Sequence, residues 1–363
     1  MLLAFALVFV FVVGASIGSF LNVAIARLPL EKSLLWPNSR CGACLQPIQW
    51  YDNIPLISYL WLRGRCRTCG QSYSILYFLI ELGTALSFVA LFWLEVVEDV
   101  HEWRPTAART FQPGIFSGSL WIGFAWHATL FSFLLVASVC DLQSREIPLP
   151  LTLTGTLVGL IGSIFLPWPW PYTTMAATPP PLPLRPFDLA MAWQTPSHGL
   201  LHGIYPWPFW GPLPGWFEPG DNWQTGLATG IIGALVGTFL LRTIGFLFST
   251  GLGKEALGLG DADLMMMAGS FLGWQIVVVA FFLSVIPALF IGMIQLVVRR
   301  DNSLPFGPSL SLSVMVTCLA WHSICEPLRP IFFSGTWLFW LVVLCAGFLL
   351  FASFVLRLLR RGE

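Results

Sequence analysis

Residues 2–26 read LLAFALVFVFVVGASIGSFLNVAIA, and none of these side chains is charged. About 20 apolar residues in a helix cross the hydrocarbon core of a bilayer, so the stretch predicts a transmembrane helix. No basic segment precedes it, and it is longer than the apolar core of a signal peptide, which favours a retained span. Gly14 and Gly18 form a small-xxx-small pair, which predicts close packing against another helix.

The rest of the chain repeats this pattern. Hydrophobic residues make up 56% of the 363 residues and charged ones only 10%, with a mean hydropathy of +0.77, whereas a soluble domain is about one quarter charged. We predict an all-α polytopic membrane protein with about nine transmembrane helices that contact membrane lipid. The expected spans are residues 2–26, 75–97, 119–140, 150–168, 226–248, 262–279, 281–298, 308–325 and 336–356, with the division inside 262–298 the least fixed.

The basic residues predict the orientation, because Lys and Arg collect on the cytoplasmic side of a membrane. With the N-terminus outside, 14 of the 18 Lys and Arg fall in or beside cytoplasmic segments. Asp141 and Asp261, each at the mouth of an apolar run, then lie at the cytoplasmic face. Acids are costly to place there, and two acids that share one proton can hydrolyse a peptide bond, so both are candidate catalytic residues. The formal net charge of zero offers no basic surface for a nucleic acid.

Two polar regions interrupt the spans. Residues 28–74 form a cytoplasmic loop, the Cys loop, and residues 166–225 form an outer loop with 14 of the 27 prolines and seven of the 18 tryptophans. Proline removes backbone donors and Trp favours the membrane interface, so we expect the outer loop to be irregular and to lean on the membrane surface. It either recognises something outside the cell membrane or is a tolerated insertion.

The Cys loop carries two cysteine pairs, Cys41-Gly42-Ala43-Cys44 and Cys66-Arg67-Thr68-Cys69. Thiolates two residues apart on a tight turn can point at one ion, and two such pairs complete a tetrahedral zinc site. Two disulfides are the alternative, which a reducing cytoplasm disfavours. Four thiolate ligands leave no open coordination position, so we expect a structural zinc. The other cysteines are expected to be buried small hydrophobes: Cys140, Cys318, Cys325 and Cys345.

Several further motifs occur in a fixed order. They are Gly18-Ser19-Phe20-Leu21-Asn22-Val23, Arg27-Leu28-Pro29, Ser39-Arg40-Cys41, Pro47-Ile48-Gln49-Trp50-Tyr51-Asp52-Asn53-Ile54-Pro55, Leu62-Arg63-Gly64, Asp141 with Ile147-Pro148 and Leu151-Thr152-Leu153, Gly258-Leu259-Gly260-Asp261, Gly269, Phe271-Leu272-Gly273-Trp274 and Leu304-Pro305-Phe306-Gly307-Pro308. With these motifs the chain resembles the bacterial type IV prepilin peptidases, a family of GxGD aspartic peptidases. The resemblance covers most of the chain outside residues 98–118, 168–225 and the last helix.

This resemblance implies that Asp141 and Asp261 are the two catalytic aspartates. It implies cleavage of the leader of a prepilin, or of a type II secretion pseudopilin, after a glycine. Methylation of the new N-terminal amine by S-adenosylmethionine would follow. It implies a location in the bacterial inner membrane, with pilus or secretion assembly proteins as further candidate partners. The residues that bind S-adenosylmethionine are unknown, because the sequence has no Gly-rich cofactor loop of the soluble kind.

We accordingly divide the chain into six regions. They are residues 1–27, the first transmembrane helix; 28–74, the zinc and methyltransferase region; 75–165, transmembrane helices with the first catalytic Asp; 166–225, the outer loop; 226–325, the peptidase core with Gly-x-Gly-Asp; and 326–363, an extra C-terminal transmembrane helix and basic tail.

The chain departs from the family pattern at two places. Many members have Lys two residues after the second aspartate, where this chain has Asp263. On a helix that residue points about 200° away from Asp261, so we do not expect it to join the catalytic pair. The stretch after the Cys loop usually reads Ser-x-Arg-Tyr-Pro-Leu-Val-Glu, but Leu76 and Phe78 replace its Arg and Pro. For Glu81, which ends this stretch, a structural ion pair and a methyltransferase role are both open.

Two alternative functions are open. If the missing Arg binds S-adenosylmethionine or substrate, the chain is a peptidase without methyltransferase activity. It could instead be a noncatalytic scaffold whose Cys loop docks an assembly factor. A zinc metalloprotease is not expected, because the five histidines form no His-Glu-x-x-His. His198 and His202 are four residues apart in the outer loop but have no obvious third ligand.

Overall fold

A computed structural model describes residues 1–101, 118–166, 223–252, 258–299 and 305–321 of the chain, and then residues 323–324, 328, 340–348, 350–351 and 354. These described residues are mostly helical and contain no β-strand, only two isolated bridges. Most of the predicted outer loop, with His198 and His202, lies outside the described residues, and so does Cys325.

The chain divides into two compact units. The first comprises Met1–Asp99 and Thr106–Pro150, and the second comprises Val100–Pro105 and Leu151–Glu363. The predicted catalytic residues are divided between them, since Asp141 belongs to the first unit and Asp261 to the second.

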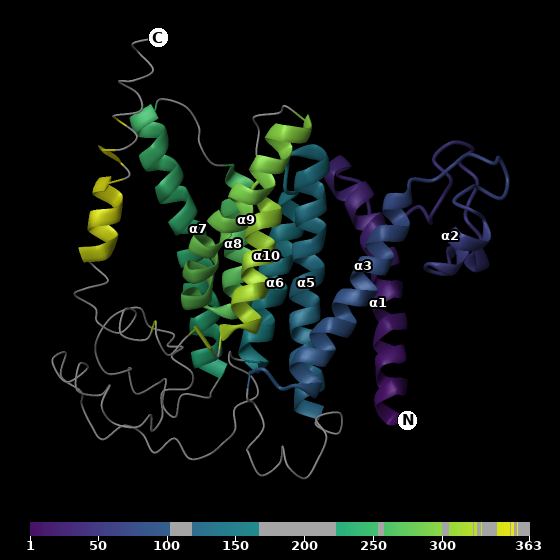
Figure 1. Cartoon of the computed structure of the whole chain (residues 1–363), viewed down its shortest axis with the longest axis horizontal. Helices are drawn as coiled ribbons and strands as arrows, with labels where there is room; N and C mark the ends of the chain where they lie inside the picture. The colour runs from purple at the N-terminus through teal and green to yellow at the C-terminus, as the bar shows by residue number, and fades with distance from the viewer. Residues whose placement is uncertain are drawn as a thin grey trace. The chain divides into compact units, whose positions relative to one another are not determined.

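The first unit is built on long apolar helices. α1 spans Leu2–Arg27, α3 spans Ile75–Phe92 and α5 spans Gly118–Ser144 (Figure 1). Shorter elements complete it: the 3-10 helices η1 (Leu28–Leu30) and η2 (Trp50–Asn53), the helix α2 (Ile57–Trp61) and the π-helical turn η3 (Trp93–Val97). The Cys loop therefore joins the C-terminal end of α1 to the N-terminal end of α3.

Helices α1 and α3 approach each other closely through glycine. A Cβ atom on Gly14 would lie 2.9 Å from Cα of Ala85, and one on Gly18 would lie 2.8 Å from Cα of Glu81. Real Cβ atoms do not come that near, so only glycine allows this approach. The predicted small-xxx-small packing is confirmed.

The second unit contains α6 (Leu149–Phe165, which begins in the first unit), α7 (Trp223–Leu252), α8 (Leu259–Leu272), α9 (Trp274–Arg299) and α10 (Gly307–Leu319) (Figure 1). Helices α7 and α8 pack backbone to backbone. A Cβ on Gly233 would collide with the Gly269 carbonyl oxygen, and a Cβ on Gly269 would collide with the Gly233 carbonyl oxygen.

Five helices of the described residues are long and apolar enough to cross a membrane. They are Leu2–Leu30, Ile75–Val97, Leu120–Ser144, Gly226–Thr250 and Trp274–Ile294. Two shorter apolar helices, Leu149–Phe165 and Gly307–Leu319, coincide with further expected spans. The molecule is thus a largely helical protein with several membrane spans.

Two sequence-based expectations are wrong. The break inside 262–298 lies at Gly273, not between residues 279 and 281, because α8 ends at Leu272 and Gly273 takes a φ of 81° that favours glycine. Cys345 is exposed, whereas Cys140 and Cys318 are buried as expected. It lies in a helical stretch, residues 340–348, in which most apolar side chains face outward.

Candidate functional site

The four cysteines of the Cys loop come together. Each residue offers one sulfur, and the four sulfurs lie within 4.8 Å of one another. The Sγ atoms of Cys41 and Cys69 are 3.8 Å apart. Four sulfurs about 2.3 Å from one zinc ion would be separated by about 3.8 Å in a tetrahedron. The donor set and its spacing therefore fit zinc, and the four cysteines are free thiols rather than disulfides.

Each of the two cysteine pairs lies on a backbone turn of the same kind. Cys41 N–H donates to Gln46 O at 3.0 Å, and Cys66 N–H donates to Gln71 O at 2.8 Å. The residue that follows the second cysteine of each pair donates its N–H to the carbonyl oxygen of the first cysteine. These bonds are Leu45 N–H to Cys41 O at 2.9 Å and Gly70 N–H to Cys66 O at 2.9 Å. Each turn thus leaves its two thiols on the same side.

Backbone donors inside these turns stabilise thiolates. The N–H groups of Cys69 and Thr68, together with the Tyr73 hydroxyl, lower the pKa of Cys66 from 9.0 to about 6. The N–H groups of Cys44 and Ala43 lower the pKa of Cys41 in the same way. Burial and hydrogen bonds with the other cysteines instead raise the pKa of Cys69 to about 11. Since zinc binds the thiolate and not the thiol, the backbone prepares Cys41 and Cys66, but not Cys69, for a cation.

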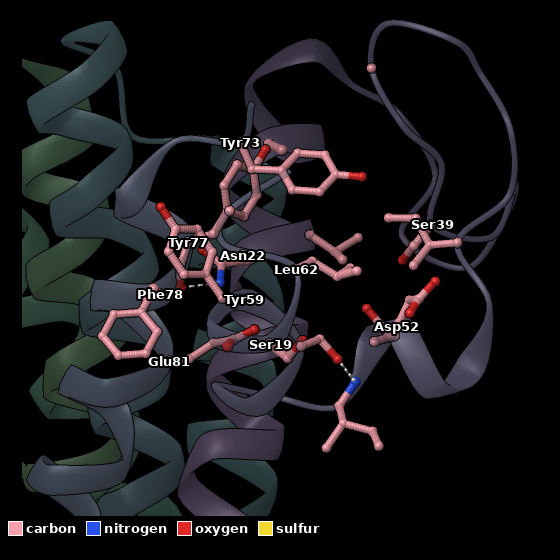
Figure 2. A pocket seen from close by; sticks show the side chains of 18 of the residues that line it. Ser19, Asn22, Ser39, Asp52, Tyr59, Leu62, Tyr73, Tyr77, Phe78 and Glu81 are labelled. Atoms are coloured by element: carbon pink, nitrogen blue, oxygen red, sulfur yellow. Dashed lines mark hydrogen bonds between the residues drawn. The ribbon is translucent and has the colours of Figure 1, made fainter. Parts of the chain in front are cut away.

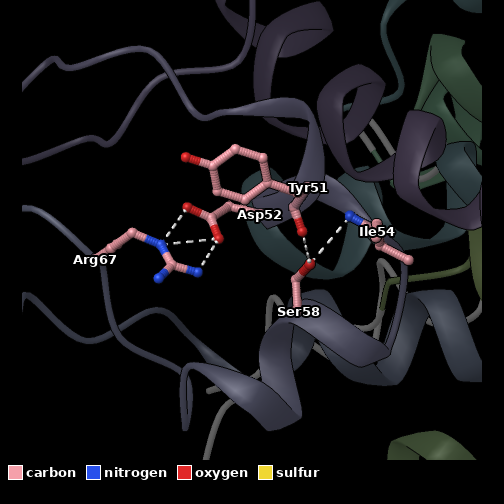
Figure 3. A network of polar contacts seen from close by, with 5 residues as sticks. All are labelled: Tyr51, Asp52, Ile54, Ser58 and Arg67. Atoms are coloured by element: carbon pink, nitrogen blue, oxygen red, sulfur yellow. Dashed lines mark hydrogen bonds and ion pairs between the residues drawn. The ribbon is translucent and has the colours of Figure 1, made fainter.

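An ion pair ties the two halves of the Cys loop together. Arg67, inside the second cysteine pair, donates to both carboxylate oxygens of Asp52, with Nε contacts of 3.0 and 2.8 Å (Figure 3). The guanidinium also lies 5.6 Å from the ring centroid of Tyr51. Hydrogen bonds from Arg67 hold the pKa of the Asp52 carboxyl below its ordinary value. Nearby, the Ser58 hydroxyl donates to Tyr51 O and accepts from Ile54 N–H.

A pocket of about 250 Å³ opens between the Cys loop and the ends of α1 and α3 (Figure 2). Its lining includes Ser19 and Asn22 from α1, Tyr77, Phe78 and Glu81 from α3, and Tyr59 from α2. Glu81 Oε2 accepts from Leu56 N–H at 2.8 Å, and Asn22 Nδ2 donates to Tyr77 O at 2.9 Å. The ring centroids of Tyr59 and Phe78 lie 5.4 Å apart. We call this cavity the Glu81 pocket.

The sequence did not predict this pocket. Ser19, Asn22 and Glu81 lie in stretches with family resemblance, but periodicity gives no sign that two helices place them together. Leu76 and Phe78, the departures from the family pattern, differ in position: Phe78 lines the pocket, whereas Leu76 does not.

Asp141 lies in the last turn of α5, not after the helix as expected. It is 7% exposed, and its carbonyl accepts from Arg145 N–H at 3.0 Å. Arg145 has a φ of 60°, and this left-handed residue ends the helix. The carboxyl group therefore sits close to the polar end of an apolar helix.

Asp261 lies in the first turn of α8, again inside the helix rather than before it. It is half-buried, and a carboxylate in a first turn is stabilised by the unpaired N–H groups there. The extended conformation of Gly258 begins the helix, and a Cβ on that glycine would lie 3.8 Å from Asp261 Oδ2.

Asp263 has its own partner. Its Oδ1 accepts from Arg242 Nη2 of α7 at 3.1 Å. The arginine on a neighbouring helix thus offsets the negative charge at the position where many family members have Lys.

Two known protein-family models match separate parts of the chain. Residues 12–94 match the bacterial peptidase A24 N-terminal domain, and residues 217–293 match the type IV leader peptidase family. The Glu81 pocket and the four cysteines fall in the first match, and Asp261 falls in the second.

Several relatives share most of the chain, and each is named prepilin leader peptidase/N-methyltransferase. The Pectobacterium carotovorum subsp. carotovorum protein is 30% identical over 327 residues, covering 83% of this chain and 88% of that protein. The Aeromonas hydrophila protein is 30% identical over 350 residues, covering 89% and 92%, and the Pseudomonas putida protein is 27% identical over 333 residues, covering 85% and 88%. No solved structure matches the chain. With 30% identity over this coverage, the chain belongs to the prepilin leader peptidase/N-methyltransferase family.

Proposed function

We propose that this chain is a membrane enzyme that cleaves the leader of type IV prepilins or type II secretion pseudopilins after a glycine and then methylates the new N-terminal residue. The observation that carries the proposal is the 30% identity to enzymes named for both activities over more than four fifths of the chain. The several apolar spans agree with a substrate that is itself anchored by an apolar helix.

Cleavage is assigned to Asp141 and Asp261. Two neighbouring acids hold a single proton, so the neutral one can polarise the scissile carbonyl while the ionised one activates water. Asp141 near the end of α5 and Asp261 in the first turn of α8 both sit where an apolar helix meets a polar segment. A prepilin has its scissile bond at such a boundary, between a basic leader and an apolar helix.

The proposed topology has about nine spans, with the N-terminus outside and the Cys loop and both aspartates at the cytoplasmic face of the bacterial inner membrane. The six sequence regions given above are proposed as its domains. Zinc in the Cys loop is proposed to be structural, because four thiolates fill a tetrahedral coordination shell. S-adenosylmethionine is the proposed methyl donor. Pilus or secretion assembly proteins are proposed as further partners.

The assignment of the aspartates can be tested by coexpression with a matched prepilin. We expect Asp141→Asn and Asp261→Asn each to reduce leader cleavage at least about a thousandfold, the usual loss for a residue of a catalytic unit. Asp263→Asn is the matched control, a carboxyl two residues from Asp261 on the same helix, and should retain most cleavage. Wild-type cleavage by both Asn variants at normal membrane levels would contradict the assignment of the two aspartates, whereas a wild-type chain that supports assembly but cleaves no prepilin would favour the noncatalytic scaffold.

A second readout distinguishes the enzyme with both activities from a peptidase without methyltransferase activity. Mass spectrometry of the processed pilin would show an N-terminal residue that is 14 Da heavier, the mass of one methylene, if methylation occurs. The replacement of the usual Pro by Phe78 does not close the Glu81 pocket, since the Phe78 ring forms part of its wall beside Tyr59. The identity to relatives named for both activities favours the enzyme that carries out both.

A further inference from the structure

The short helix α2 of the Cys loop leaves its apolar side uncovered. Ile57, Leu60 and Trp61 are 60, 65 and 78% exposed. Their spacing of i, i+3 and i+4 places them on one face of the helix, which we call the α2 face. Ser58 and Tyr59, on the opposite side, line the Glu81 pocket, as Figure 2 shows for Tyr59. The helix thus turns its polar groups inward and its apolar groups outward, the reverse of a helix that faces water.

Contacts with α3 hold α2 beside the membrane helices and not beyond their ends. The N–H of Leu56, the residue before α2, donates to Glu81 Oε2 at 2.8 Å. Glu81 lies six residues after Ile75, where α3 begins, which is about 9 Å along the helix axis. The ring centroids of Tyr59 and Phe78 lie 5.4 Å apart. In Figure 1, α2 accordingly lies alongside the first turns of α3.

We propose that the α2 face inserts into the lipid interface and holds the Cys loop against the surface of the bilayer. Helices α1 and α3 are both long and apolar enough to cross a membrane, and the Cys loop joins the end of one to the start of the other. The bilayer surface therefore passes close to the level of α2. Helices that lie in a membrane surface bury their apolar face about 5–10 Å into the boundary between headgroups and acyl chains, which agrees with the depth at which Leu56 is held.

The same end of α3 already presents apolar side chains outward. Ile75 and Leu79, in its first two turns, are exposed. On a membrane span such side chains contact lipid. Since α2 is fixed to α3 within these two turns, its apolar face extends a surface that lipid already covers.

Aromatic and basic residues flank the α2 face. Trp50, at the start of η2, is exposed, and the Ser58 hydroxyl ties η2 to α2 by donating to Tyr51 O at 3.2 Å. Arg63, just after α2, is also exposed. Tryptophan favours the headgroup level of a membrane, and a guanidinium can bind a lipid phosphate. The Cys loop has five basic and two acidic residues, a charge that suits anionic headgroups.

The tether explains why a helix of five residues is enough. A free helix of this length would not be stable in water. Both ends of the Cys loop are attached to membrane spans, so insertion of the α2 face is an intramolecular step. The hydrogen bond from Leu56 to Glu81 also fixes the start of the helix before any lipid is bound.

The first test places a photoreactive benzoylphenylalanine at position 60 or 61 of the full chain, which is then illuminated in native membranes. Each position should form phospholipid adducts, detected by mass spectrometry, at about ten times or more the level found at position 68, because lipid surrounds a side chain in the interface. Thr68 is the matched control, since it is exposed but lies between Arg67 and Cys69 in a polar turn.

Two results would overturn the proposal. Cross-links from positions 60 and 61 to a pilin or another protein, in place of lipid, would make the α2 face a protein-binding surface. Adducts no more abundant than at position 68 would show that the face points into water.

A second test measures the effect of insertion on the backbone. With Leu60→Gln and Trp61→Gln combined, amides of residues 56–63 should exchange hydrogen about tenfold faster or more in nanodiscs of phosphatidylethanolamine and phosphatidylglycerol, because the helix loses its apolar contacts. Zinc content equal to that of the wild type would show that the Cys loop remains folded. Leu45→Gln is the matched control, since Leu45 is 67% exposed in the first cysteine turn, and it should leave exchange of residues 56–63 unchanged. Wild-type exchange in the double variant would contradict the insertion.

Discussion

At the scale of single residues, Asp263 shows how a departure from a family pattern can be compensated elsewhere. The sequence has a third acid two residues after Asp261, where many family members have Lys. Its partner Arg242 is 21 residues away in sequence and belongs to α7, so no local pattern could have indicated the pair. The pair neutralises the negative charge of Asp263, although it is not net positive as a Lys would be.

Reversing this pair gives a first prediction. Asp263→Lys alone sets two cations side by side and should cost about 1 kcal/mol of stability, since partly exposed pairs contribute about 0.2–1 kcal/mol. Adding Arg242→Asp should recover most of that loss. Thermal unfolding in detergent measures both changes. If the change in stability of the double variant equals the sum of the changes in the two single variants, the pairing is contradicted.

The two cysteine turns give a second prediction at this scale. The residue after each second cysteine is left-handed, Leu45 with a φ of 59° and Gly70 with a φ of 72°. Glycine adopts this conformation without the strain that a Cβ atom causes in other residues, so Gly70→Ala should weaken the turn by about 1 kcal/mol. Leu45→Gly should be neutral or slightly stabilising. Zinc affinity measured against a chelator reports both, and opposite signs for the two variants are the expected result.

The cysteines also show what spacing can predict. The C-x-x-C pairs identified four residues that the structure brings within 4.8 Å, because the chemistry of a tight turn is local. Asn22 and Glu81 could not be placed in a pocket from sequence, because they meet only after two helices have packed.

At the scale of elements, glycine decides how helices meet. Gly233 of α7 and Gly269 of α8 each face the other's carbonyl oxygen, with no space for a side chain. Long apolar runs predicted most of the five membrane-length helices found among the described residues, because length and hydropathy are averaged over many residues. The break at Gly273 was misplaced because it depends on one backbone conformation.

This packing gives a third prediction. Gly269→Leu should push α7 and α8 apart and cost about 3 kcal/mol or more, because overpacking into rigid backbone cannot be relieved by a change of rotamer. Gly83→Ala on α3 is the matched control, since a Cβ there would meet nothing within 4 Å. The amount of folded protein in membranes and its melting temperature measure the difference. Equal behaviour of both variants would show that α7 and α8 do not pack this tightly.

At the scale of the whole molecule, two compact units carry different parts of the proposed chemistry. The Cys loop and the Glu81 pocket belong to the first unit, and the Gly-x-Gly-Asp motif belongs to the second. Composition alone predicted a membrane protein, since so few residues are charged. The pairing of Asp141 with Asp261 is a proposal about tertiary arrangement, so motif order can suggest it but cannot derive it.

Removal of the metal gives a fourth prediction. Metal analysis should find one zinc per chain, and Cys66→Ser should abolish it. Because the four cysteines lie in residues 28–74, the proposed methyltransferase region, loss of zinc should lower methylation about tenfold or more while leader cleavage continues. Restoring zinc to the chelated wild type should restore methylation. Equal loss of both activities would mean that the metal supports the entire molecule.

The glycine contacts that join α1 and α3 have a consequence for biogenesis. They lie inside the apolar helices Leu2–Leu30 and Ile75–Val97 and involve none of the four sulfurs. Insertion of the newly made chain therefore does not have to wait for metal. A bacterium grown under zinc starvation would accumulate an inserted but unfinished enzyme, and a return of the metal would complete that stock without new synthesis.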